Sequence, residues 1–488
     1  MGTSMEPAKG NSLHQILDAD MIGNLPMRSS CRLMRTLIAI GACALGAAAC
    51  SDDEAPSRSI QIMHWWNAGG EKEAIDAVLG AFEERNPSIR VLDDASVGGG
   101  STEQRLALAT LFHEGLLPDT FQANGGWGLL AWVLYDGSVE STKLAQIDDL
   151  ADDWRGSVPD SVLASVSYPP GPPGAEMHQY AVPLNIHRLN TLFYNKDVFA
   201  QIGILNPEEE LTELWQLFDA AARVRQLSQD IHKPITPIAL GYGEKQDWSM
   251  SLLFFENLLV GRQRGALYQE LFDDPANFDP FSAEFVATLE DFRTLMSYAN
   301  DDANELPWDK AMARVLKGEA AMTIMGDWAK GYADAQEEEE HRLAYGFIPM
   351  PGTAQTFVFT TDTFSLPIKD EKQMDTTREL LRFFGSADGQ KIFNEKKGSI
   401  SARTDVGIPE GDNRQATFAA FSDMAITKIG ATSLRAPQTW VDAVSKAIAT
   451  FATDWKTGSP SEVQHTIRNY SDVLLDSCCS LMTGCCPQ

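Results

Sequence analysis

The main body of this sequence lacks cysteine. No cysteine occurs between Ser51 and Ser477, and the seven in the chain lie near its two ends, at positions 31, 43, 50, 478, 479, 485 and 486. A disulfide scaffold and a cysteine nucleophile are therefore excluded for the body, which has to rely on a hydrophobic core. The CC-x5-CC tail within residues 476–488 could bind a soft metal or form disulfides. We interpret it as an unstructured appendix.

Basic residues are also scarce. The chain has 39 Lys+Arg against 68 Asp+Glu, which gives a formal net charge of −29. Such an acidic chain would be repelled by phosphate, so a role on nucleic acid or on an anionic lipid surface is excluded. Charged residues make up 22% and hydrophobic residues 44% of the chain, as in ordinary globular proteins with a core. The length of 488 residues predicts more than one structural unit.

Hydrophobic runs long enough to cross a membrane are missing too. The run from Leu37 to Ala49 is shorter than the ~20 residues of a membrane helix, and basic residues precede it, at Arg28, Arg32 and Arg35. That arrangement is typical of a secretory signal. Cys50 follows three alanines and resembles the lipidated cysteine of a bacterial lipobox, with Ala-x-Ala cleavage as the alternative. We therefore predict a signal peptide with an upstream extension over residues 1–50. The remainder is expected in the periplasm or cell envelope, either as a lipoprotein anchored at Cys50 or in diffusible form.

The common catalytic and cofactor motifs are absent. The sequence has no HExxH, no GxSxG, no Walker A loop and no GxGxxG opening a helix. The eight histidines lack metal-ligand spacing and no aspartate series matches an EF-hand loop, so we predict neither a cofactor nor a metal site. Gly98 to Ser101 could cradle an anion before a helix, but we interpret it as a flexible connection. Hydrolysis by a carboxylate pair remains open, because such pairs leave no sequence signature.

The hydrophobic patterns of the remaining sequence predict two α/β units. Alternating and helical patterns predict a strand, helix, strand, helix and strand over residues 59–64, 71–85, 89–92, 101–114 and 119–123. This order implies a doubly wound sheet with right-handed crossovers. A second series has strands at 192–196, 235–240, 320–325 and 357–366 and helices at 211–227, 249–260, 283–299, 378–384, 390–396 and 436–454. Glu337–Glu340 is predicted to be a solvated loop.

A pair of tryptophans and a glutamate stand where the first strand meets the first helix. Trp65 and Trp66 follow His64, and Glu71 opens the helix, where the helix dipole favours an anion. Ligands of open α/β sheets bind outside the carboxyl ends of strands. Aromatic planes with carboxylates, amides and a lysine at the edge suit a sugar ring. The alternative is core packing for both tryptophans and a capping role for Glu71.

The same residue types recur at the ends of other predicted strands. They are Gln122, Asn124, Trp328 and Asp362. Planar amides, carboxylates and tryptophan on several separate loops therefore favour a binding site over coincidence.

Longer motifs then indicate a family. They are YAVPLNIHR at 180–188, LFYNK at 192–196, GEAAMTIMGDW at 318–328, TDTF at 361–364, and GQKIFN with KGSI at 389–400. In this order they resemble the family 1 extracytoplasmic sugar (solute)-binding proteins of ABC transporters, over residues 59–451. HWW-x-x-GGE, VPLNIHR and MGDW are similar to the glucose/mannose-binding subgroup.

The resemblance implies a two-lobed periplasmic-binding-protein fold (type II), an α/β fold whose doubly wound sheets are joined by three hinge crossings. By analogy the N-terminal lobe covers 51–184 with 362–405, and the C-terminal lobe covers 185–361 with 406–475. The positions that match the family's sugar-binding motifs are Trp65, Trp66, Glu71, Gln122, Trp308, Trp328, Asp362 and Lys397, with His187 in the hinge motif. The subgroup often has Lys or His at Asn124 and a His near Thr432, so these two departures leave the exact sugar open.

The resemblance also implies a function. We expect a non-enzymatic, monomeric binding protein that captures a monosaccharide, of the glucose or mannose type, between its lobes and delivers it to ABC permease subunits. One alternative is a glycoside hydrolase that uses Glu71 and Asp362 as acid and base. Another is a sugar sensor that presents its closed form to a chemoreceptor.

Overall fold

The structure is a computed structural model and describes residues 56–67, 69–95, 102–136, 141–168, 176–243, 249–340 and 344–474. The predicted signal peptide, the predicted lipidation site Cys50, the connection at residues 98–101 and the Cys-rich tail lie outside these residues.

The first unit contains a five-stranded sheet in the order β2–β1–β3–β13–β6. Its strands are β1 (Arg58–His64), β2 (Ile89–Ala95), β3 (Thr120–Asn124), β6 (Ala181–Pro183) and β13 (Asp362–Ser365). β2 and β3 pair with β1 in parallel, and α2 (Gly69–Arg85) and α3 (Thr102–Glu114) connect them. The predicted β-α-β-α-β order is therefore confirmed. β13 returns from far along the chain and pairs antiparallel with β3 and β6.

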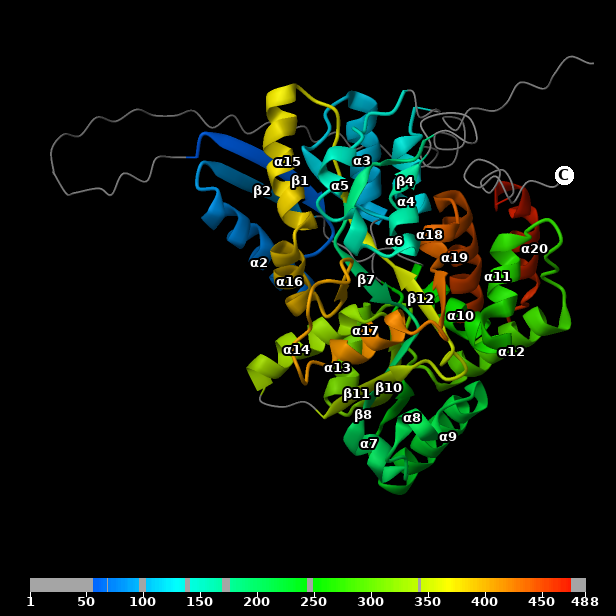
Figure 1. Cartoon of the computed structure of the whole chain (residues 1–488). Coiled ribbons are helices and arrows are strands. Elements are labelled where there is room, and N and C mark those ends of the chain that lie inside the picture. Colours follow the sequence, from blue (N-terminus) through cyan, green and yellow to red (C-terminus); the bar gives the residue numbers. More distant parts are fainter. Residues whose placement is uncertain are drawn as a thin grey trace, which may run out of the picture.

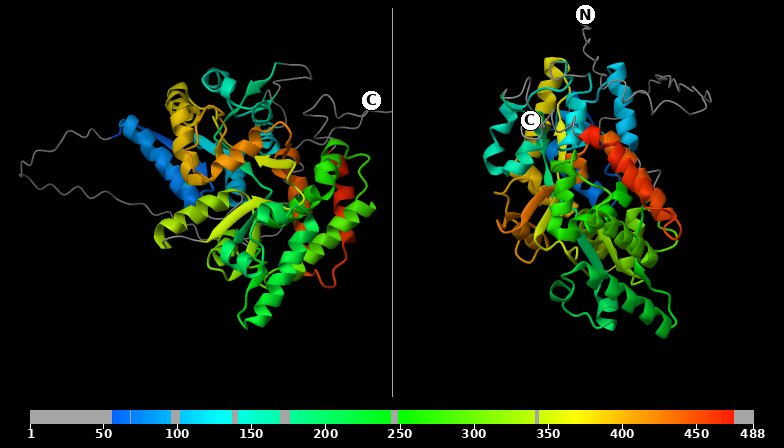
Figure 2. Two further views of the ribbon diagram at one scale, coloured as in Figure 1. Left: turned by 60° about the horizontal axis from the view of Figure 1, so that its bottom comes forward. Right: turned by 90° about the vertical axis from the view of Figure 1, so that its right-hand side faces the viewer.

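The second unit contains a four-stranded sheet in the order β11–β8–β10–β9. These strands are β8 (Thr191–Asn195), β9 (Thr236–Ile238), β10 (Ala320–Met325) and β11 (Tyr345–Pro349). The larger helices of this part of the chain are α9 (Leu214–Asp230), α10 (Ser249–Gly261), α12 (Ala283–Tyr298), α13 (Trp308–Leu316), α14 (Trp328–Glu340) and α19 (Gln438–Thr453). Apart from the predicted strand at 357–366, the predicted strands and helices of the second series are present, most of them with small shifts at their ends, and the helix predicted at 378–384 runs from Glu371 to Gly385. In Figure 1, α2, α3 and α15 (Glu371–Gly385) lie in the upper part of the molecule and α7 to α9 at the opposite end, and Figure 2 shows the same separation from other sides.

A third sheet lies between these units and is made of strands that cross from one to the other. Its order is β14–β7–β12–β15, and the strands are β7 (Asn185–Arg188), β12 (Thr356–Thr360), β14 (Ile400–Ser401) and β15 (Thr427–Gly430). β12 is antiparallel to β7 and parallel to β15. The shorter elements are α4 (Trp127–Val133), α5 (Asp148–Ala151), α6 (Asp160–Ala164), β4 (Ser167–Tyr168), β5 (His178–Gln179), α7 (Lys196–Gln201), α8 (Pro207–Glu210), α11 (Ala266–Asp273), α16 (Ala387–Lys397), α17 (Arg414–Ser422), α18 (Thr432–Arg435) and α20 (Ser461–Asn469).

Two large hydrophobic cores run through the described residues. The first core draws on residues 60–186 and 357–434, and the second core on residues 189–358 and 429–474. β12 lies between them, since Phe357 and Phe359 belong to the first core and Val358 to the second. Alternate residues of a strand point to opposite faces, so one strand serves both cores.

Two predictions about elements are wrong. The predicted strand over 357–366 is two strands, because the chain leaves the crossing sheet after Thr360, which is opposite His187, and joins the five-stranded sheet at Asp362, opposite Asn124. The predicted loop at Glu337–Glu340 is the last turn of α14. Glutamate is a good helix former, so a run of it can continue a helix that is already anchored by packing. Among the described residues, no helix is both long and apolar enough to cross a membrane.

Candidate functional site

The crossing strands bring a carboxylate and its hydrogen-bond donors together. Asp362 is the first residue of β13. Its carboxylate accepts hydrogen bonds from Gln122 Nε2 at 2.9 Å and from Asn185 Nδ2 at 2.7 Å. His187 Nε2 lies 3.2 Å from the same carboxylate. Gln122 comes from β3 of the first unit, whereas Asn185 and His187 come from the crossing strand β7. Asp362 is therefore fixed at the junction of two sheets.

His187 extends this network toward the second core. Its Nδ1 contacts the Asp327 carboxylate, whose other oxygen accepts a hydrogen bond from Arg188 N at 3.0 Å. Asp327 follows β10, and its own backbone N–H donates to Arg188 O at 2.9 Å. The His187 ring meets the Trp328 ring edge-on, with 5.3 Å between centroids. The His187 imidazole thus links two carboxylates from different sheets: Asp327, which follows β10, and Asp362, which begins β13.

The charges in this network stabilise one another. Burial alone would lower the pKa of His187, but the charge of Asp327 and hydrogen bonds to Asp327 and Asp362 raise it above its usual value, with Lys397 acting against them. Burial alone would raise the pKa of Asp362, but His187, Lys397 and Asn185 lower it to about 2. Asp362 is therefore a carboxylate near neutral pH.

A second ion pair lies beside the tryptophan pair. Lys397, at the end of α16, contacts the Glu71 carboxylate, and its Nζ lies 5.4 Å from the centroid of the Trp66 ring. The Lys397 side chain is buried, and Glu71 is partly exposed. Glu71 occupies the first turn of α2, as predicted. Here a cation, an anion and an aromatic face occupy one small region.

Trp65 and Trp66 differ in their surroundings. Trp66 is fully buried and packs on Phe364 and Phe393, with ring centroids 5.8 and 4.8 Å away. Trp65 is half-buried at the rim of the first core, and its backbone N–H donates to Gln122 Oε1 at 3.2 Å. One tryptophan is thus a core residue that contacts Lys397, whereas the other is more open, in keeping with the alternation expected where a strand ends.

The two other tryptophans of the predicted site, Trp328 and Trp308, lie on helices that pack against the second core. Trp328 begins α14, and its ring covers Gly326, where a Cβ atom would lie 2.0 Å from the ring. The glycine of the MGDW motif therefore makes room for the tryptophan. Trp308 begins α13 and meets Tyr332 edge-on, with 5.8 Å between ring centroids. Trp308 therefore contacts α14, the helix that Trp328 begins, through the ring of Tyr332.

Asn124 and Thr432, the two departures from the subgroup pattern, have different positions. Asn124 is half-buried and lies opposite Asp362 in the pairing of β3 with β13. The backbone N–H of Thr432 donates to Glu256 Oε1 at 2.8 Å and its hydroxyl does so at 3.1 Å. Glu256 is fully buried, which raises the pKa of its carboxyl. Asn124 therefore borders the cluster, whereas the Thr432 side chain is turned to Glu256.

Several polar residues of the network were missed by the sequence reasoning. Asn185 and Asp327 stand inside the VPLNIHR and MGDW motifs, beside the residues that were chosen, so motif membership was their only signal. His64 Nε2 lies 2.7 Å from an oxygen of Asp93, while His64 Nδ1 accepts a hydrogen bond from Trp66 N at 3.1 Å. No sequence pattern linked Asp93 to the tryptophan turn, because the pairing of β2 with β1 brings it there.

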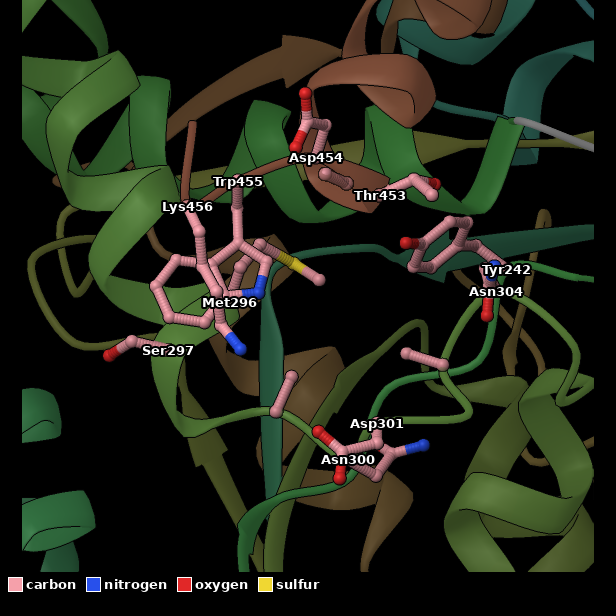
Figure 3. A pocket seen from close by; sticks show the side chains of 13 residues that line it. Tyr242, Met296, Ser297, Asn300, Asp301, Asn304, Thr453, Asp454, Trp455 and Lys456 are labelled. Atoms are coloured by element: carbon pink, nitrogen blue, oxygen red, sulfur yellow. The ribbon is translucent and has the colours of Figure 1, made fainter. Parts of the chain in front are cut away.

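A separate cavity of about 240 Å³ lies in the second unit and is lined by none of the predicted site residues. Figure 3 shows Tyr242, Trp455 and Asn300 around it. Asn300 Oδ1 accepts a hydrogen bond from Leu240 N at 2.8 Å, and Asn300 Nδ2 donates one to Leu240 O at 3.1 Å. Lys456 Nζ lies 5.3 Å from the centroid of the Trp455 ring. These groups serve local structure, so we assign the cavity no role. In the described part of the chain, no three His, Cys, Asp or Glu side chains are grouped as a metal site would need.

Comparison with known proteins identifies the family. The family model for bacterial extracellular solute-binding proteins matches residues 68–391, more than half of the chain. An uncharacterised ABC transporter extracellular-binding protein of Pyrococcus horikoshii is 32% identical over 76% of this chain and 78% of its own length. A probable sugar-binding periplasmic protein of Rhizobium meliloti is 27% identical over 77% and 82%. The glucose-binding protein GlcS of Saccharolobus solfataricus is more distant, at 21% identity over 68% and 58%.

Solved structures show the same fold. T. maritima MalE3 with bound maltose superposes with a TM-score of 0.69, covering 86% of this chain and all of that one at 16% identity. The solute receptor AcbH, described as exclusive for β-D-galactopyranose, gives a TM-score of 0.67 over 85% and 98% at 17% identity. The two-lobed fold is confirmed by this likeness. The chain belongs to the family of bacterial extracellular solute-binding proteins.

Proposed function

We propose that this chain is the substrate-binding component of an ABC sugar importer. It captures a monosaccharide of the glucose or mannose type between its two lobes, which close around the sugar by a hinge movement. The observation that carries the proposal is the Asp362–His187–Asp327 network, which joins the first unit, the crossing strands and the second unit at one point. A ligand held there contacts both lobes and therefore favours the closed state.

The chemistry around this network suits a sugar. Asp362 and Glu71 offer carboxylate acceptors, Gln122 and Asn124 offer planar amides, and Lys397 offers a donor; bonds to ionised groups are roughly twice as strong as neutral ones. Trp65 and Trp328 supply apolar planes for the faces of the ring, each contributing about 1 kcal/mol. Trp66, Trp308 and His187 complete the proposed site.

The choice of a monosaccharide rests on the compactness of this cluster. His187 contacts Asp362 and Asp327 and meets Trp328, so the polar groups gather beside one aromatic plane. The relatives include proteins named for glucose and for unspecified sugars, and solved structures include receptors of a galactopyranose and of maltose. The sugar therefore has to be decided by experiment.

The lobe boundaries belong to the same proposal. The N-terminal lobe is 51–184 with 362–405 and the C-terminal lobe is 185–361 with 406–475. The two cores support the first two crossings. The first stretch of the first core ends at Ile186, and the second core begins at Leu189, so the chain passes between the lobes there. At β12 the chain returns to the first core, which resumes at Phe357. The third crossing, at residue 405, has no such support, because Phe421 also packs in the first core.

Export and anchoring complete the proposal. The chain would act as a monomer in the periplasm or cell envelope, tethered by a lipid on Cys50, and its closed form would dock on permease subunits in the inner membrane. Metabolic labelling with a fatty acid tests the anchor. The native protein should take up the label and a Cys50→Ala variant should not.

A glycoside hydrolase is less well supported. Such an enzyme needs one carboxyl group protonated as general acid and therefore a raised pKa. Asp362 has its pKa lowered to about 2, and Glu71 contacts Lys397. Release of product from an aryl glycoside would favour the hydrolase, and tight stoichiometric binding without turnover would exclude it. A sensor role would need the same capture with a chemoreceptor as partner.

The test is a thermal-shift panel on the full chain. It would include glucose, mannose, galactose, xylose, arabinose and maltose, with inositol as a polyhydroxy control. A ligand at 100 times its dissociation constant should add about 2.7 kcal/mol to the free energy of unfolding. The largest shift should come from glucose or mannose. A panel without any shift would overturn the sugar assignment, and a shift by maltose alone would overturn the monosaccharide.

A further inference from the structure

Three glycines from three helices meet backbone to backbone beside the candidate site. A Cβ atom on Gly331 of α14 would lie 2.5 Å from Lys397 O and 2.6 Å from Lys396 O. A Cβ atom on Gly70 of α2 would lie 2.5 Å from Gly331 O. Gly398, which ends α16 in the left-handed conformation with φ +83°, lies so close that its Cβ would be 2.6 Å from Gly331 N. A Cβ atom essentially never lies within 3.0 Å of a non-bonded heavy atom, so none of these positions has room for a side chain.

This contact, which we call the glycine seam (Gly70, Gly331 and Gly398), joins the two cores. α2 packs into the first core through Ala74 and Val78, and α16 does so through Phe393. α14 packs into the second core through Ala329 and Ala333. In Figure 1, α14 lies beneath α2 and α16, and it contacts both of them. The seam is therefore a contact between the two lobes and not within one lobe.

Each helix of the seam also carries a residue of the proposed sugar site. Glu71 follows Gly70, Lys397 precedes Gly398, and Trp328 stands one turn before Gly331. Glu71 and Lys397 contact each other, and Trp328 meets His187. The distance between the helix backbones at the seam therefore sets the distance between the ligand groups of the first lobe and Trp328 of the second.

We infer that the glycine seam is the contact at which the lobes stop when they close, and that closure needs a residue without Cβ at Gly331. Helix formation gives no reason for glycine there, because alanine is the better residue inside a helix. Gly331 is also the member of the seam whose close contacts lie entirely in the other lobe. Its close neighbours are backbone atoms of α16 in the other lobe, whereas Gly70 also contacts Lys396 O within its own lobe. The inference rests on the proposed function only where sugar affinity is the readout; the exchange measurement does not depend on that function.

The test is a Gly331→Ala variant of the full chain, with Gly80→Ala as matched control. Gly80 also lies inside a helix of the structure, α2, but a Cβ atom there would meet nothing within 4 Å. Hydrogen–deuterium exchange should become faster in Gly331→Ala at residues 69–74 and 394–398, which belong to the opposite lobe. Alanine in α14 cannot produce that change through its own helix. Gly80→Ala should not speed exchange at either segment, and alanine in α2 can only slow it at residues 69–74.

Sugar binding gives the second readout, with D-glucose as probe. A blocked closed state lowers the competent fraction, and the apparent dissociation constant rises in proportion. We expect a rise of at least tenfold for Gly331→Ala and less than twofold for Gly80→Ala. Native-like exchange across the seam with unchanged affinity would overturn the inference, as would faster exchange throughout α10 and α12, which would mean that the fold itself is lost. If the native chain does not bind glucose, the proposed function is in question, and the exchange result alone decides whether the seam exists.

Discussion

The two halves of the proposed site are built differently. The half on the first core is polar and closed in: Gln122, Asp362 and Lys397 are each at most 4% exposed, and each is hydrogen-bonded or ion-paired. The half on the second core is aromatic and more open, since Trp308 and Trp328 are only partly buried and are held by ring contacts. The halves therefore differ in emphasis: buried polar groups predominate on the first core, beside Trp65 and Trp66, and partly exposed tryptophans predominate on the second core, beside Asp327.

This difference has a physical consequence for the order of binding. Hydrogen bonds to ionised groups are directional and strong, so the polar half can select and orient a sugar before the lobes close. Aromatic contacts depend on close approach, and they are gained when the second lobe arrives. His187 is the residue at which the two halves meet, because it contacts Asp362 on one side and Asp327 and Trp328 on the other.

The largest effect is expected from removing the central carboxylate of the polar half. Asp362→Ala takes away the partner of His187 and the acceptor of Gln122 and Asn185. Loss of two charge-assisted hydrogen bonds to a sugar, at about 1.5 kcal/mol each, should weaken binding about 100-fold. Breaking a buried charge pair should cost about 3 kcal/mol of stability, so the protein should stay folded. Calorimetry and urea unfolding measure the two effects.

Asp405→Ala is the matched control for this variant. Hydrogen bonds from Arg403 lower the pKa of Asp405 to about 2, as low as that of Asp362, but the Asp405 side chain is 47% exposed. An exposed pair contributes about 1 kcal/mol or less, and no change in sugar affinity is expected. If Asp362→Ala behaved like Asp405→Ala in both measurements, the polar half would have no special role.

A smaller effect is expected from the aromatic half. Trp328→Ala removes one plane from the proposed site, which should weaken sugar binding about tenfold, in line with about 1 to 1.5 kcal/mol per aromatic contact. Trp215→Ala is the control, because Trp215 is 65% exposed and lies in the first turn of α9 in the second lobe. The fluorescence change on binding should become smaller in the first variant and stay unchanged in the second. A loss as large as that of Asp362→Ala would remove the contrast between the halves.

The smallest effect is expected from pH, through the residue that joins the halves. The pKa of His187 is raised in the folded protein, so its contribution to stability is present below the ordinary value of 6.5 and is lost as pH rises through the raised pKa. Neutral histidine has one N–H and cannot donate to both Asp327 and Asp362. Unfolding free energy measured between pH 6 and 9 should therefore decline, and His187→Gln should flatten that decline. An unchanged slope in the variant would assign the decline to other groups.

Local patterns predicted most of the elements. β10 runs over Ala320–Met325 as expected, and the order of β1, α2, β2, α3 and β3 was predicted because apolar periodicity reports which face of a strand or helix is buried. The two errors have different origins. At Thr361 the chain changes sheets in the middle of a segment that alternates like one strand, because its two parts pair with different distant strands. At Glu337–Glu340 a helix continues through glutamates, which are good helix formers.

The sequence by itself determined the class of fold, the absence of cysteine from the body and the residue types suited to a sugar. Only the tertiary structure decided how these residues are connected. Asp362 is bonded to Gln122 and Asn185, which are 240 and 177 positions away, and Lys397 contacts Glu71 at a separation of 326. The glycine seam likewise joins helices that lie far apart in the chain. The physical reason is range: secondary structure follows from neighbours within a few residues, whereas the network and the seam form only after the crossing strands bring two cores together.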